Sequence, residues 1–93
     1  MKVRISCDDK YEAQKLASLI FIKDAEETFI TAILNIIDNE MVVLLKDKSA
    51  HSILLKDETH VEIFADFIQS VIDKEHKIIS TVIAEQDVEI VKG

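Results

Sequence analysis

The chain has 93 residues, of which 48% are hydrophobic, and its 11 basic and 18 acidic residues give a formal net charge of −7. This length suits one domain with one modest core, and the apolar content argues against intrinsic disorder. The acidic excess argues against direct binding of DNA or RNA, which relies on Lys and Arg to neutralise phosphates. Gly93 is the only glycine, so the sequence cannot form the glycine-rich turns that hold nucleotide phosphates.

A membrane-spanning helix needs about 20 consecutive apolar residues, and every apolar run in this sequence is far shorter. The charged start of the chain predicts no secretion signal. The one cysteine, Cys7, cannot form an internal disulfide, which suits a reducing compartment. We therefore expect a cytoplasmic protein that does not bind membranes. No internal repeat is apparent, and we expect a single domain over residues 1–93.

The first predicted elements are a strand and a short helix. Apolar and polar residues alternate over Lys2–Cys7, as in a half-buried strand. Asp9 is placed to cap a helix, with Glu12 completing a capping box. Apolar residues at helical spacing extend this helix to about Lys23. An acidic connector follows, with Asp24, Glu26 and Glu27.

The middle of the chain predicts a hairpin. Thr28–Ile37 is apolar on both faces, which predicts a strand that is central in its sheet or covered on its second face. A turn over Asp38–Glu40, with Asn39 in the left-handed conformation, leads to a strand over Met41–Leu45. Ile53–Leu55 is either a third strand, completing a meander, or the approach to a helix. We favour the meander.

The clearest predicted helix begins at Thr59, which forms a capping box with Glu62. Its apolar stripe runs from Val61 to Ile72. Two extended segments end the chain, over 77–84 and 88–91. The order β-α-β-β-(β)-α-β-β predicts an α+β fold with an antiparallel sheet of four to six strands and two helices on one face. Without the strand at 53–55, the first six elements follow the split βαβ order of ferredoxin-like folds.

The sequence contains no recognisable catalytic, cofactor-binding or metal-binding set of residues. His51, His60 and His76 lack the close spacing of a metal motif. Cys7 precedes a helix start that favours a thiolate, but it continues the inward alternation of the first strand, and we expect a buried core thiol. The paired carboxylates lie at predicted turns and helix starts, where capping and solvation explain them. We expect that the protein is not an enzyme and needs no cofactor.

The acidity and the apolar surplus instead predict a protein-interaction domain, a regulator or inhibitor of the kind that phages and mobile elements encode. Its partner would be a protein with a basic surface, and one version of this hypothesis is imitation of nucleic-acid charge. The terminal strands, over 2–6 and 88–91, are candidate open edges for a homodimer. The alternative function is a homodimeric, ferredoxin-like domain that binds a small molecule. The residues predicted to form the acidic face are Asp24, Glu26, Glu27, Asp57, Glu58 and Glu62, and those predicted to form an apolar contact are Phe21 and Ile22.

Overall fold

The computed structural model describes residues 1–20 and 28–93. The predicted end of the first helix, its acidic connector, Phe21 and Ile22 lie outside the described residues. The described elements, in chain order, are β1 (Lys2–Ser6), α1 (Lys10–Ile20), β2 (Ile30–Ile37), β3 (Glu40–Leu45), β4 (Ala50–Leu54), α2 (Glu58–Ile72), β5 (Ile78–Ala84) and β6 (Asp87–Lys92).

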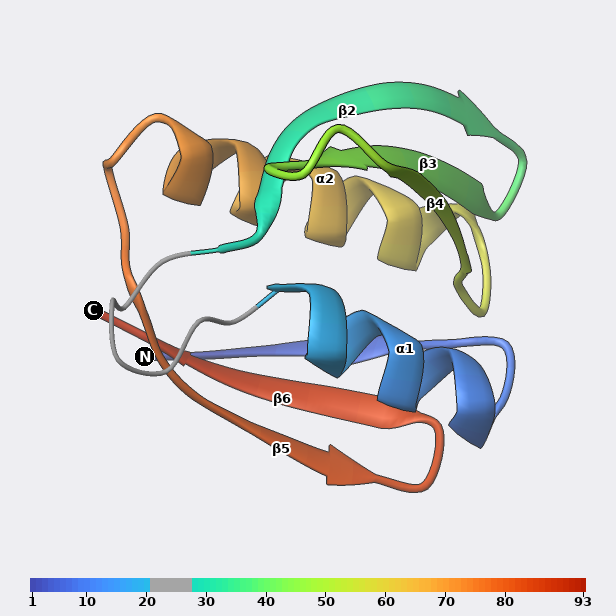
Figure 1. The fold of residues 1–93 in the computed structure, drawn as a ribbon. Coiled ribbons are helices and arrows are strands. Elements are labelled where there is room, and N and C mark those ends of the chain that lie inside the picture. The colour runs from blue at the N-terminus through green and yellow to red at the C-terminus, as the bar shows by residue number, and fades with distance from the viewer. Residues whose placement is uncertain (21–27) are drawn as a thin grey trace.

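The predicted α+β class and order of elements are confirmed, and the segment before α2 is a strand, so the middle of the chain is a meander. Instead of the predicted single sheet with both helices on one face, the six described strands form two three-stranded antiparallel sheets, with the orders β1-β6-β5 and β2-β3-β4. Figure 1 shows the two helices lying between the two sheets. Each helix contacts both sheets: α1 packs on β5, β6 and β4, and α2 on β2 and β1. Two sheets can therefore share one core.

The fold is a repeated β-α-β-β unit, although the sequence shows no repeat. The unit β1-α1-β2-β3 has the same order as β4-α2-β5-β6, and the first strand of each unit pairs with the last strand of the other. The burial patterns of β2 and β5 agree position by position over the seven residues of β5, and each strand has a register shift directly after its first residue. The two halves are thus related by a pseudo-two-fold axis.

The positions of the strands in the sheets correct two predictions. The strand predicted to be central or covered, β2, lies at the edge of its sheet. Its apolar second half is exposed instead of buried. The last strand, predicted as an open edge, is β6, and it lies at the centre of its sheet between β1 and β5. Hydrophobic patterning reports how apolar a strand is, and an exposed apolar edge produces the same pattern as a buried strand.

Side chains close the edges of β1 and β4 where the two sheets meet. Cys7 and Leu55 form an antiparallel bridge between the ends of the two strands. The Nδ1 of His60 accepts the Ser6 N–H at 3.1 Å, and a carboxylate oxygen of Glu12 accepts the Leu54 N–H at 2.9 Å. These two contacts correspond under the pseudo-two-fold axis. Glu12 therefore satisfies a strand edge instead of completing the predicted capping box.

The core lies between the sheets and is filled from both halves. Phe64 of α2 is its largest fully buried side chain. Cys7 is also fully buried, which confirms its predicted place in the core. The other core side chains within the described residues include Ile5, Leu16, Ile20, Met41, Val43, Ile53, Leu55, Ile68, Ile78, Val88 and Ile90.

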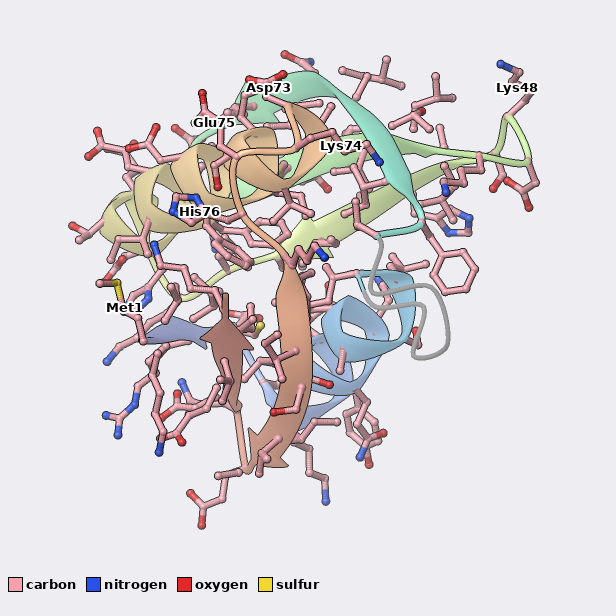
Figure 2. The ribbon with its side chains drawn as sticks, turned by 90° about the vertical axis from the view of Figure 1, so that its left-hand side faces the viewer. Met1, Lys48, Asp73, Lys74, Glu75 and His76 are labelled. Atoms are coloured by element: carbon pink, nitrogen blue, oxygen red, sulfur yellow. The ribbon has the colours of Figure 1, made fainter. Side chains whose placement is uncertain are left out.

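Within residues 1–20 and 28–93, four turns use left-handed backbone without glycine, at Asp38, Lys48, Lys74 and Glu85. In Figure 2, Lys48 marks one of these turns at an outer corner of the molecule, and Lys74 marks another at the end of α2. Asp38, and not Asn39, takes the left-handed conformation in the β2–β3 turn, with a φ of 54°. The amide of Asn39 instead donates to the Leu55 carbonyl at 2.8 Å. This side chain ties the turn to the junction of the two sheets.

Candidate functional site

An acidic groove lies between α2 and the end of β2. Its volume is about 490 Å³. Three of its acidic side chains, Glu58, Glu62 and Asp66, follow one another at intervals of four residues along α2, and such residues share one helix face. Asp38 supplies the fourth carboxylate from the β2–β3 turn. The apolar lining consists of Ile36, Val61 and Ala65.

The structure brings together only part of the predicted acidic face. Glu58 and Glu62 line the groove. Asp57 has a different role, because its carboxylate accepts the His60 N–H at 3.0 Å and caps α2. The predicted cap, Thr59, lies within the first turn of the helix. The remaining predicted residues of the acidic face, Asp24, Glu26 and Glu27, and the predicted apolar contact, Phe21 and Ile22, lie outside the described residues.

Sequence reasoning missed five of the seven groove residues, of which Val61 and Ala65 belong to the apolar stripe of the predicted helix. Asp66 was detectable, because the spacing of Glu58, Glu62 and Asp66 places all three on one face of the predicted helix. Ile36 and Asp38 belong to a segment at least 20 positions earlier in the sequence. They reach the groove because α2 packs against β2, and local patterning carries no signal for that contact.

The other half of the molecule shows what is specific to this groove. Under the pseudo-two-fold axis, α1 corresponds to α2 and β5 to β2. The positions that correspond to Glu58, Glu62 and Asp66 are Lys10, Gln14 and Ser18. The same frame is thus acidic beside β2 but carries no acidic residue at these positions beside β5.

Both strands beside these helix faces are apolar edges. No charged residue occurs in β2 or β5, although 31% of the chain is charged. Charged residues and prolines are the usual means by which proteins block unwanted strand pairing at an edge. The exposed apolar side chains of the two strands are Leu34, Ile36 and Ile37 in β2, and Ile79, Val82 and Ile83 in β5.

The histidines and Cys7 occupy structural positions. The imidazole of His51, a residue of β4, lies 2.9 Å from the Ser49 hydroxyl. His76 lies just beyond α2, in the turn labelled in Figure 2, and its buried Nδ1 has no partner among the described residues. Burial raises the pKa of the Cys7 thiol to about 12, and the carboxylates of Glu12, Asp87 and Asp9 act in the same direction. This thiol is therefore protonated and unreactive in the folded protein.

The described parts of the chain contain no group of three or more His, Cys, Asp or Glu side chains arranged to hold a metal ion. None of the described helices is long and apolar enough to cross a membrane. Comparison with protein-family models, curated proteins and solved structures finds no match to this chain. The functional argument therefore rests on the groove and on the strand beside it.

Proposed function

We propose that this protein is an interaction domain that regulates another protein by binding a basic segment of it in the acidic groove. The observation that carries this proposal is the convergence of four carboxylates on an apolar lining that contains no basic residue. Opposite charges around an apolar contact favour the encounter with a basic partner and disfavour acidic ones.

The spacing of the carboxylates favours an extended segment. Residues four apart on a helix are separated by about 6 Å along its axis. In an extended strand, side chains on one face recur about every 6.6 Å, because each residue advances about 3.3 Å. A strand with Lys or Arg at alternate positions therefore matches the row Glu58, Glu62 and Asp66.

The apolar lining distinguishes the groove from an imitation of DNA. A copy of the phosphate backbone presents charge alone, whereas Ile36, Val61 and Ala65 offer an apolar contact beside the carboxylates, which suits the aliphatic stems of Lys and Arg. The groove therefore resembles a receptor for a basic peptide segment more than a copy of the nucleic-acid backbone. Binding such a segment would prevent the partner from using it elsewhere, which is the basis of the proposed regulatory role.

The test compares two variants of equal net charge. Glu62→Lys/Asp66→Lys reverses two groove charges, and Glu75→Lys/Glu85→Lys reverses two exposed charges that do not line the groove. Each tagged protein is used to capture partners from a lysate treated with nuclease, and bound proteins are quantified by mass spectrometry.

We expect a protein that the wild type and the control retain, that the groove variant loses, and that is released as salt increases. Equal recovery of every bound protein by the two variants would contradict the proposal. Circular dichroism and thermal unfolding of both variants show whether the fold is intact.

A further inference from the structure

We infer that the protein also assembles with itself, through antiparallel pairing of β2 of one copy with β5 of the next. The inference rests on β2, whose residue Ile36 also lines the groove of the proposed function, and a second copy would compete with the basic partner for this side of the molecule. Both strands end their sheets, and an unpaired edge presents backbone donors and acceptors that another strand can pair with.

The closure of the other two edges supports this assignment. His60 and Glu12 accept backbone N–H groups of β1 and β4, and the carbonyls of Ser6 and Leu54 accept the N–H groups of Lys56 and Asp8. Within the described residues, no other element closes β2 or β5 in this way. β2 pairs with β3 alone and β5 pairs with β6 alone, and the side chains that accept the N–H groups of Ile30 and Ile36 are the neighbouring Thr28 and Asn35. The open edges are the uncharged strands.

The pseudo-two-fold axis makes the two open edges equivalent in shape. Figure 1 shows β2 and β5 on opposite sides of the molecule. Each is flanked by a helix on the inner face of its sheet, α2 beside β2 and α1 beside β5. A second copy can be placed with its β5 antiparallel to β2 and with the inner faces of the two joined sheets on the same side. In that arrangement, α1 of the second copy lies on the same face as α2.

Charge then selects which edges meet. Pairing β2 with β2 would place one row of Glu58, Glu62 and Asp66 beside another, and like charges at an interface are unfavourable. Pairing β2 with β5 places that row beside α1, which has Lys10, Gln14 and Ser18 at the corresponding positions. It also lets every copy use both open edges, whereas a dimer through β2 alone leaves β5 bare. A head-to-tail contact of this kind generates rings or filaments.

The experiment uses single reporter cysteines and a thiol-specific bifunctional cross-linker on the full chain. Leu34→Cys places a thiol on β2 and Val82→Cys places one on β5, both at positions that are more than half exposed. The native thiol of Cys7 is buried and does not compete. We expect cross-linked dimers when the two variants are mixed, and little product from either variant alone.

Helix residue Gln14 supplies a matched pair of charge variants. Each variant is introduced into the Val82→Cys protein. Gln14→Lys should increase the yield of mixed dimers and Gln14→Glu should reduce it. Each change should be at most about fivefold, because exposed ion pairs contribute up to about 1 kcal/mol. Thermal unfolding checks that both variants fold.

Three results would overturn the inference: no product in the mixture, product mainly from Leu34→Cys alone, or equal changes with Gln14→Lys and Gln14→Glu. Absence of self-association would leave the proposed function standing if the groove variant still loses its captured partner. If the groove variant retains every captured protein and the mixed reporter variants still cross-link, the proposed function is contradicted and the inference of self-assembly stands.

Discussion

Replacing Glu12 by Ala tests whether side chains hold the two sheets together at their junction. The side chain of Glu12 is only 13% exposed, and one of its oxygens accepts the Leu54 N–H at 2.9 Å while the other lies 3.0 Å from the Lys15 ammonium. The ion pair is partly exposed at Lys15 and contributes little. The hydrogen bond has a charged acceptor, and its loss leaves the N–H of Leu54 without a partner in a half-buried strand.

We therefore expect Glu12→Ala to lower the free energy of unfolding by about 2 kcal/mol, within the range of about 1.5–3 kcal/mol for hydrogen bonds to charged groups. Glu12→Gln keeps an acceptor oxygen at the same position and should cost less than about 1 kcal/mol. Urea denaturation of the three proteins measures both values from the shift in midpoint at a constant slope.

If Glu12→Ala lowers the free energy of unfolding by less than about 0.5 kcal/mol, the substitution has no more effect than an ordinary surface substitution, and the reasoning is refuted. Equal losses for the Ala and Gln variants would show that the carboxylate acts through its bulk or charge and not as an acceptor. The corresponding contact in the other half gives an independent check, because His60→Ala removes the acceptor of the Ser6 N–H.

Two further predictions concern pH. Burial raises the pKa of Cys7 to about 12 from 9.0, so the unfolded chain releases the thiol proton at a lower pH than the folded protein does. The free energy of unfolding should therefore fall from about pH 9 towards pH 12, by at most about 1.4 kcal/mol per pH unit. Urea denaturation should show a smaller fall for Cys7→Ala than for the wild type, and identical falls would contradict the assignment. The pKa of Asp47 is lowered by hydrogen bonds from the Ser49 hydroxyl and backbone N–H, so its contribution is present at neutral pH and is lost as the pH falls below about 4. Thermal unfolding of Asp47→Asn should therefore vary less between pH 5 and pH 3 than that of the wild type, and an equal dependence would exclude this role.

The class and order of the elements follow from local patterning, because alternation and helical spacing are visible within each segment. The arrangement in two sheets depends on contacts between segments far apart in the chain, such as the bridge between Cys7 and Leu55. The repeat escapes notice because few residues are shared at corresponding positions, among them Ile5 with Ile53 and Asp9 with Asp57. Burial and helix capping require the same type of residue at those positions in both halves, whereas most other positions have no such requirement.

The candidate site was predictable in the same partial way. Glu58 and Glu62 were expected on an acidic face, because helix-start carboxylates are visible in the sequence. The groove needs α2 to pack against β2, and the prediction that β2 is buried concealed it. An apolar strand with no charged residue, such as Ile30–Ile37, is consistent with both a central strand and an edge that another chain covers, and the structure distinguishes them.

The most direct test of the central claim, that β2 is an open edge built to be covered, is hydrogen–deuterium exchange of the full chain at low and high protein concentration. At low concentration we expect fast exchange in β2 and β5 and slow exchange in β3 and β6, since only edge strands have backbone groups open to water. At high protein concentration, protection from exchange should rise in both β2 and β5, because self-assembly covers both strands. On addition of the captured partner, protection should rise in β2 alone. Exchange in β1 and β4 should stay unchanged in both cases. Protection of β2 that equals that of β3 and does not change with concentration or partner would contradict the account.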